Sequence, residues 1–287
     1  MPPALRAAFW MSGAIVSFTL MAIAGRAVAL DLDTFEIMMY RSIVGVVIVY
    51  AVALFAGTLH QIRPRKLGLH AIRNISHFAG QNLWFYAITV IPLAQVFALE
   101  FTSPLWAMFL AVFILGERLN RVKILTAVFG FGGILLVARP FGASIEFGML
   151  MAAVAAIGFA GSAVFTRLLT RTETITAILF YLTAMQFILG LGFAGFDGDI
   201  TLPNVQNVPW LLLIAICGLV AHFCLTTALS IAPAATVMPI DFVRLPVIAF
   251  IGMLFYSEAL DPWVFAGAIV IFGANYFNIW HASRQST

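Results

Sequence analysis

The stretch PLAQVFALEFTSPLWAMFLAVFILGERL, residues 92–119, places an acidic residue, Glu100, inside a largely apolar run. The stretch PAATVMPIDFVRLPVIAFIGMLFYSEAL, residues 233–260, repeats this layout 141 residues later and places Asp241 at the equivalent position. Apolar runs of this length are typical of helices that cross a membrane. A carboxylate inside such a helix is costly unless it is paired, hydrated or protonated, so both acids are candidates for a functional role.

The similarity between these two stretches extends well beyond them. A shift of 141 residues, without any gap, makes 11 of the 47 residues in 87–133 identical to their counterparts in 228–274. One constant offset over such a length indicates a duplicated sequence unit. We assign the two copies to residues 1–143 and 144–287.

The composition of the chain is that of a membrane protein. It is 63% hydrophobic and 9% charged, with a mean hydropathy of +1.05, which leaves too little polar surface for a soluble domain. Backbone groups in lipid must be satisfied internally, so each apolar run of about 20 residues is expected to be helical. The predicted fold class is an all-α polytopic membrane protein with ten transmembrane helices, at about 8–30, 35–56, 68–90, 93–115, 121–139, 147–168, 174–195, 209–230, 233–255 and 262–281.

The distribution of Lys and Arg predicts the orientation, because these residues concentrate in cytoplasmic loops. A cytoplasmic N-terminus places 11 of the 15 basic residues, Arg73 among them, on the inner side. Arg26, Arg41 and Arg139 then fall on the outer side, and Arg244 lies within a helix. Both termini are therefore predicted to be cytoplasmic. Each copy contains five helices, an odd number, so the two copies form inverted repeats, an architecture found in many secondary transporters.

The two acids and their neighbours are candidate substrate contacts. Glu100 and Asp241 follow Pro92 and Pro233 by eight residues, about 12 Å along a helix axis, which places both near the bilayer midplane. Arg244, three residues after Asp241, either pairs with it on the same helix face or presents its guanidinium group to a substrate carboxylate. Glu100 has no basic residue in reach on its own helix, and it is expected either to contact the substrate or to take up a proton.

The remaining candidates for a substrate cavity are polar or aromatic residues inside predicted helices: His77, Gln81, Asn82, His222, Trp84 and Trp106. The shift of 141 carries Gln81 onto position 222 (81 + 141 = 222), so Gln81 and His222 occupy equivalent places. Polar side chains of this kind either line a cavity or hold helices together by hydrogen bonds.

Several classes of function lack a sequence signal. No cluster of His, Cys and carboxylates has the spacing of a metal site, no serine lies in a nucleophile motif, and no phosphate-binding loop is present. We therefore expect no metal, no cofactor and no enzyme activity. The basic pI of about 9.1 follows from the cytoplasmic loops and requires no nucleic-acid partner. Small residues such as Gly132 and Gly273 permit close helix packing within one chain or between chains, and a monomer is the simplest state.

Four short motifs carry a resemblance to a known family. They are Met39-Tyr40-Arg41, Gly116-Glu117-Arg118-Leu119, Ile134-Leu135-Leu136-Val137 and Ser257-Glu258-Ala259-Leu260. Together with the ten-helix layout, they resemble the EamA branch of the drug/metabolite transporter superfamily over essentially the whole chain, and most of all its bacterial amino-acid and metabolite exporters. The resemblance implies a central substrate cavity lined by helices 1, 3, 4, 6, 8 and 9.

These observations lead to an expected function. We expect a carrier of the bacterial inner membrane that exports amino acids or similar small metabolites by alternating access. The alternative is uptake of a cofactor-like metabolite, such as riboflavin or S-adenosylmethionine. A membrane scaffold or enzyme without transport activity is a further possibility. An enzyme would gather catalytic groups near one membrane face, whereas the polar residues here spread symmetrically about the middle.

Overall fold

The computed structural model of this chain describes residues 3–29, 31–116, 121–138, 146–196, 198–259 and 262–285, and the regular structure in these ranges is helical. Glu117, Arg118, Leu119, Arg139 and Leu260, which the sequence singled out, lie outside the described residues. The helices are α1 (Pro3–Val28), α2 (Thr34–Phe55), η1 (Leu59–Gln61), α3 (Leu67–Val90), α4 (Leu93–Glu100), α5 (Ser103–Leu115), α6 (Arg121–Ala138), α7 (Phe147–Leu169), α8 (Ile175–Ala194), α9 (Val208–Ile231), α10 (Ala234–Val237), η2 (Met238–Val243), α11 (Arg244–Tyr256) and α12 (Pro262–Gln285).

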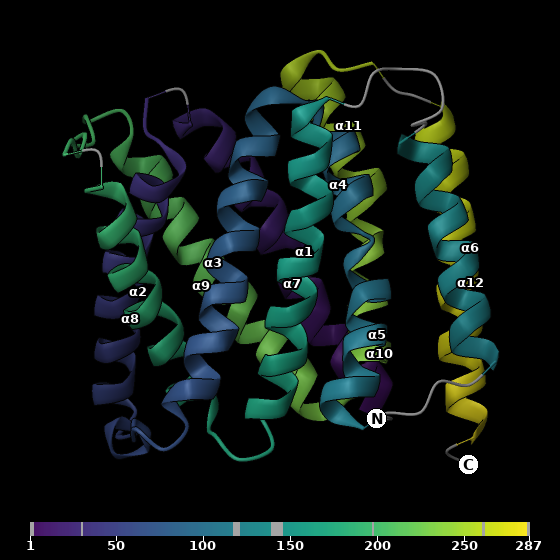
Figure 1. Cartoon of the computed structure of the whole chain (residues 1–287), viewed down its shortest axis with the longest axis horizontal. Coiled ribbons are helices and arrows are strands. Elements are labelled where there is room, and N and C mark those ends of the chain that lie inside the picture. Colours follow the sequence, from purple (N-terminus) through teal and green to yellow (C-terminus); the bar gives the residue numbers. More distant parts are fainter. Residues whose placement is uncertain are drawn as a thin grey trace.

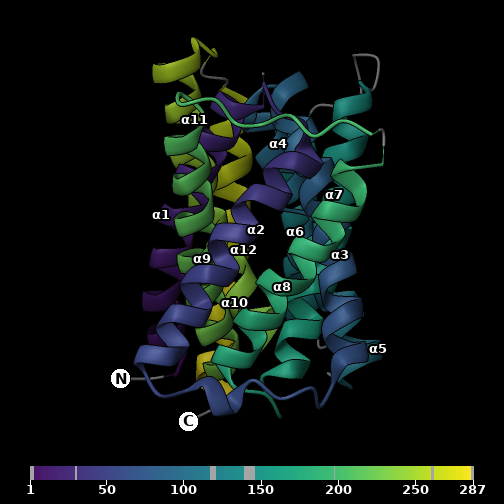
Figure 2. The same cartoon turned by 90° about the vertical axis from the view of Figure 1, so that its left-hand side faces the viewer.

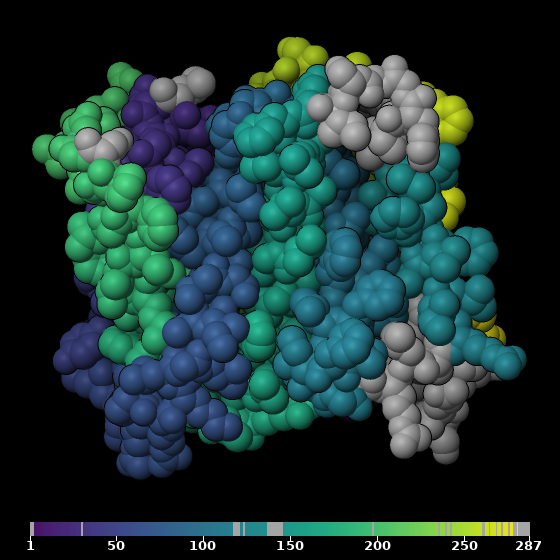
Figure 3. Space-filling view, viewed as in Figure 1, coloured from purple at the N-terminus to yellow at the C-terminus, as the bar shows by residue number. Residues whose placement is uncertain are grey.

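Six segments in the described ranges are long and apolar enough to cross a membrane. They are α1, α2, α7, α8, α9 and the combined segment Leu93–Leu115. The other predicted spans correspond to α3, which carries buried polar residues, and to α6, α11 and α12, whose apolar stretches are shorter. Large apolar side chains such as Phe55 and Phe113 point outward and are more than four-fifths exposed. The outer faces of the helices, which form the surface in Figure 3, therefore suit contact with lipid.

The helices stand side by side in one bundle, with both chain ends at the same end of it (Figure 1). In the centre α1 packs along α9 and α3 packs along α7. The pairs α2–α8 and α6–α12 lie at opposite sides of the bundle, one in front of the other in Figure 2. The shift of 141 residues carries α3 onto the bounds of α9 (67 + 141 = 208 and 90 + 141 = 231). The central pairs α1–α9 and α7–α3 are therefore counterparts of each other.

The predicted helix at 93–115 is broken beside its acidic residue. The first part, α4, ends at Glu100, and α5 begins at Ser103. Pro104 has no N–H group to donate to the backbone carbonyl of Glu100, four residues earlier. That carbonyl accepts a hydrogen bond from the Ser103 hydroxyl instead, at 2.5 Å. The proline therefore accounts for a break that apolarity alone did not predict.

The predicted helix at 233–255 is broken in the same region. It consists of α10, the 3₁₀ segment η2 and α11, and Asp241 lies within η2. Pro239 and Pro246 each remove one backbone donor from this segment, which favours the interruption. Broken helices at membrane depth occur where the backbone is buried in protein or lines a cavity, and they mark binding sites in several transporter folds.

Close packing of α3 against α7 depends on two glycines. A Cβ atom added to Gly158 would lie 2.7 Å from the carbonyl oxygen of Ser76 and 2.8 Å from the Cα of Gly80. Backbone therefore meets backbone at this crossing, and a side chain would force the helices apart. This close approach fixes α3 and α7 as neighbouring walls of the cavity described next.

Candidate functional site

A cavity lies between α1, α3, α7 and α9 and extends to the breaks in the two interrupted helices. The space between its lining atoms, open solvent included, amounts to about 740 Å³. Arg73, His77 and Gln81 recur every fourth residue along α3, so they share one face of that helix. The polar residues that line the cavity are Arg73, His77, Gln81, Glu100, Ser103, Ser162, Thr166, His222, Thr226, Asp241 and Arg244.

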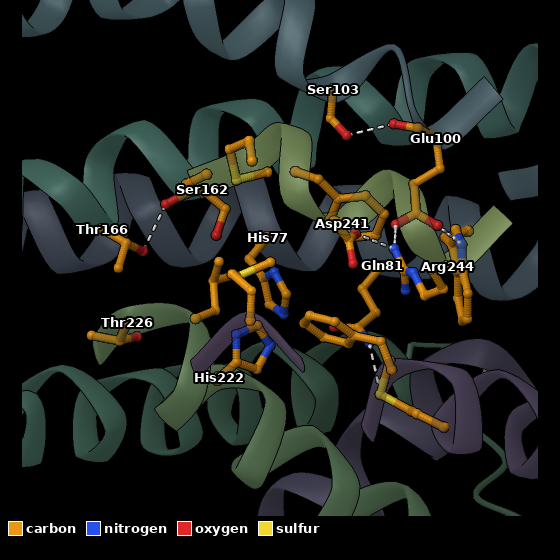
Figure 4. Close-up of a pocket in the computed structure, with 18 of the residues that line it drawn as sticks. His77, Gln81, Glu100, Ser103, Ser162, Thr166, His222, Thr226, Asp241 and Arg244 are labelled. Atoms are coloured by element: carbon orange, nitrogen blue, oxygen red, sulfur yellow. Dashed lines mark hydrogen bonds and ion pairs between the residues drawn. The ribbon is translucent and has the colours of Figure 1, made fainter. Parts of the chain in front are cut away.

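A cluster of three charged residues occupies one end of the cavity, where both helix breaks meet (Figure 4). Arg244 Nη2 donates to Glu100 Oε1 at 2.5 Å and to Asp241 Oδ2 at 2.6 Å. The indole N–H of Trp84 donates to the other oxygen of Glu100 at 2.7 Å. The guanidinium carbon of Arg244 lies 4.7 Å from the ring centre of Phe97, which adds a cation–π contact. The single guanidinium group of Arg244 is therefore the counter-charge of two buried carboxylates.

The structure shows the pair between Arg244 and Asp241 that the sequence offered as one alternative. Both ion pairs of Arg244 use Nη2, and its Nε–H has no partner among the described residues, so a contact with a substrate stays a prediction. Glu100, which has no basic residue on its own helix, receives the same arginine from the other half of the chain. Glu100 lines the cavity and its carboxylate has two donors within the protein, so its role as a substrate contact stays a prediction.

The middle of the cavity offers unused hydrogen-bonding groups. His77 Nε2, Gln81 Oε1 and both ring nitrogens of His222 are buried and have no hydrogen-bond partner among the described residues. The His77 and His222 rings meet edge to face, with their centres 4.6 Å apart, and Figure 4 shows them between the charged cluster and Thr166. Buried polar atoms are almost always paired in folded proteins. These atoms therefore form a surface that suits a polar ligand.

The other end of the cavity contains an arginine that the sequence placed at the membrane surface. Arg73 is 2% exposed and lies inside α3. Its Nε–H donates to Thr166 Oγ1 and its Nη1 donates to Asn74 Oδ1, both at 3.1 Å. Arg73 is therefore a buried residue of the bundle, and its assignment to the inner side stays a prediction. The spacing to His77, four residues on, was a signal that Arg73 shares the face of the cavity residues.

Arg41, which the sequence assigned to the outer side, is also buried, in α2. It is 6% exposed, and its Nη1 lies 3.7 Å from the sulfur of Met21. The guanidinium group lines a smaller pocket together with Gln186 and His222. Because His222 also lines the main cavity, the two spaces adjoin at this histidine.

Two predicted cavity residues lie elsewhere. Asn82 is buried, but its amide donates to the carbonyl of Phe78 at 2.8 Å, and it is not among the lining residues. Trp106 is 42% exposed and borders a separate apolar hollow between α5 and α6. Sequence reasoning also missed the hydroxyl groups of Ser162, Thr166 and Thr226, because such small residues are common in any membrane helix.

An ion pair closes the bundle at the end opposite the two termini. Arg26 Nη1 of α1 lies 2.5 Å from Glu258 Oε1, just beyond α11. The same carboxylate accepts the backbone N–H of Leu93, at the start of α4, at 3.2 Å. The Arg26 guanidinium carbon also lies 4.6 Å from the ring centre of Tyr256. This contact joins α1, α4 and the end of α11, and so connects the two halves of the chain.

Comparison with known proteins identifies relatives over most of the chain. The EamA-like transporter family matches it twice, over residues 5–139 and 146–280. A riboflavin transporter of Brucella anthropi is 33% identical over 220 residues, which cover 75% of this chain and 78% of that protein. An S-adenosylmethionine uptake transporter of Rickettsia bellii is 23% identical and covers 96% of this chain and 94% of its own length.

Two further comparisons identify a relative that is named as an exporter and a solved structure with a similar fold. A pseudopaline exporter of Pseudomonas aeruginosa is 25% identical and covers 89% of each chain. A solved crystal structure shares 18% identity and a TM-score of 0.75, over 98% of this chain and 99% of the other. At that identity the likeness shows the fold alone.

Proposed function

The chain belongs to the EamA-like transporter family, and on this premise we propose that it takes up a cofactor-like metabolite across the bacterial inner membrane. The family match confirms the resemblance seen in the sequence, and the relatives are named as transporters rather than enzymes. The proposed cargo contains a flat heteroaromatic ring, as riboflavin and S-adenosylmethionine do. The proposed mechanism is alternating access to the cavity between α1, α3, α7 and α9.

One observation carries the choice of cargo, namely the combination of rings and unused polar atoms in the middle of the cavity. Phe18, Phe159 and Trp84 line the cavity together with the two histidines. The unpartnered atoms of Gln81 and His222 lie among these rings. A heteroaromatic ligand presents apolar ring faces and polar ring edges, which matches such a lining. The three residues of the charged cluster pair with one another, although Asp241 Oδ1 and Arg244 Nε have no partner among the described residues.

The names of the relatives support the same choice. A second riboflavin transporter, from Rhizobium johnstonii, is 30% identical over 75% of this chain. Export, the direction that the sequence favoured, is named in one of these relatives, the pseudopaline exporter. We therefore place uptake of a cofactor-like metabolite first and amino-acid export second.

We further propose that residues 1–143 and 144–287 are inverted repeats of five helices each, with both termini in the cytoplasm. The coincidence of the α3 and α9 bounds under the shift of 141 supports the repeat. The location of both chain ends at one end of the bundle supports an even number of crossings (Figure 1). Alternating access then requires the contact between Arg26 and Glu258 to open in one state and close in the other.

Counterflow in proteoliposomes tests the cargo. Liposomes that contain the purified protein are loaded with unlabelled riboflavin, S-adenosylmethionine or one of a panel of amino acids, and uptake of the same labelled compound is followed. Accumulation of labelled riboflavin or S-adenosylmethionine above that in protein-free liposomes would support the proposal. Exchange of amino acids alone would replace it with the second candidate. Absence of exchange for every compound would overturn both.

The second candidate, amino-acid export, has one observation in its favour. The cavity has two carboxylates with one arginine at one end, and Arg73, without an acidic partner among the described residues, at the other. A zwitterion with an amine at the first end and a carboxylate at the second would complement this arrangement. Efflux of labelled amino acids from cells that overproduce the protein, compared with cells that lack it, tests this candidate directly.

A further inference from the structure

Arg73 is a buried cation that no carboxylate of the described chain neutralises. Its hydrogen-bond partners are a hydroxyl group and an amide, those of Thr166 and Asn74. Both partners are neutral, so the full positive charge of the guanidinium group remains at this end of the cavity. Burying a charge without a counter-charge is costly, which makes this a place where an anion gains free energy.

Arg41 increases the positive potential at the same place. It is buried, its only polar contact among the described residues is the sulfur of Met21, and its charge repels that of Arg73. The two acids that line the main cavity share Arg244 at the other end of the cavity, and neither of them pairs with Arg73 or Arg41. Arg73 lies about 12 Å along α3 from Gln81, at the far end of the cavity from that cluster.

We propose that Arg73, with Thr166 and His77 beside it, forms an oxyanion subsite that binds a carboxylate or phosphate group. A guanidinium group offers a planar fork of N–H donors to two oxygens of such a group. The Nη2 group of Arg73 makes no hydrogen bond within the described residues, and His77 Nε2 has none either. The Thr166 hydroxyl donates to the carbonyl of Ser162 and holds the arginine in place through its oxygen.

This subsite deepens the proposed function, on which it rests for the assumption that the cavity is the transport site. It selects, among heteroaromatic metabolites, those that carry an acidic group some distance from the ring. The ring would lie in the middle of the cavity beside His222 and Gln81, and the acidic group would lie at Arg73. S-adenosylmethionine, with its carboxylate, meets this requirement, and riboflavin becomes acidic only when phosphorylated.

Thermal unfolding of the purified protein in detergent tests the subsite without any cargo, with inorganic phosphate and acetate as the probes. Each anion should raise the melting temperature of the unmodified protein in a saturable manner, as expected for a ligand that binds the folded state. The same rise is expected for Arg63→Gln, which removes an exposed loop arginine whose Nε–H donates to the carbonyl of His60. Arg73→Gln should lose the saturable rise. An equal rise in Arg73→Gln and Arg63→Gln would overturn the proposal.

A second variant covers the case in which Arg73→Gln does not fold. Arg73→Lys keeps the charge but loses the fork, so the saturable rise should be smaller than in the unmodified protein. An undiminished rise in Arg73→Lys would contradict the assignment of the fork. Neither unfolding measurement uses a cargo, so a failure of riboflavin counterflow does not change the result of the anion test. A failure of the anion test likewise does not change the result of counterflow.

Discussion

Replacing both carboxylates that share Arg244 should destabilise the protein by much more than the sum of the two single replacements. In Glu100→Gln, Arg244 keeps Asp241 at 2.6 Å, and in Asp241→Asn it keeps Glu100 at 2.5 Å. In each case the new amide oxygen can still accept a hydrogen bond. Each single change should therefore lower the free energy of unfolding by only about 1 kcal/mol. The double variant leaves a buried guanidinium group without a counter-charge, which costs about 3–5 kcal/mol.

The reason for this non-additivity lies in the geometry of the cluster. Both carboxylates bond to the same nitrogen of Arg244, so each can substitute for the other as its counter-charge. Adding Arg244→Met to the double variant removes the unpaired cation as well. That triple variant should recover most of the lost stability, because buried ion clusters can be replaced by apolar groups at little net cost.

Denaturant unfolding of the purified protein in micelles, followed by tryptophan fluorescence, measures all four variants. The account predicts an interaction energy between the two acids of at least about 1 kcal/mol. Additive single effects would show that the two acids do not share Arg244. A triple variant no more stable than the double variant would show that the unpaired cation is not the source of the loss.

Two further predictions concern the closed end and the helix packing. Glu258→Gln removes the ion-pair partner of Arg26. It should therefore increase the labelling of a cysteine introduced at Ser103 when a membrane-impermeant thiol reagent is added on the side of this ion pair. Unchanged labelling would contradict closure by this pair. Gly158→Ala should lower the free energy of unfolding by about 1–3 kcal/mol, because its Cβ would lie 2.7 Å from a backbone oxygen. Gly192→Ala, with open space at its Cβ, is the matched control, and equal costs would refute the close approach.

Much of the architecture could be predicted from the sequence because a small number of physical constraints determines where membrane helices lie. Apolar length and the need to satisfy backbone groups located the helices, and the constant shift of 141 related their bounds. The acids at 100 and 241 were recognisable because a carboxylate in an apolar run is rare and costly. The shift of 141 related Gln81 to His222, and both of these residues line the cavity.

Contacts between helices could not be predicted in the same way. Helix periodicity reports neighbours along one helix, so it offered Asp241 as a partner of Arg244 and could not show Glu100 from the other half. Arg73 was counted among the basic residues that predict orientation, although it lines the cavity. The sequence could not separate the two cases, because loop arginines and cavity arginines both occur near helix ends. The outward direction of Trp106 was also invisible, since no polar face distinguishes one side of α5 from the other.

The central claim is that the cavity between α1, α3, α7 and α9 is the transport site, and adjacent residues of α3 test it most directly. Gln81 lines the cavity, and its neighbour Asn82 does not. The measurement is counterflow of labelled riboflavin and S-adenosylmethionine in proteoliposomes that contain Gln81→Leu or Asn82→Leu. The account predicts that exchange is lost in Gln81→Leu and retained in Asn82→Leu. Equal exchange in the two variants would contradict it.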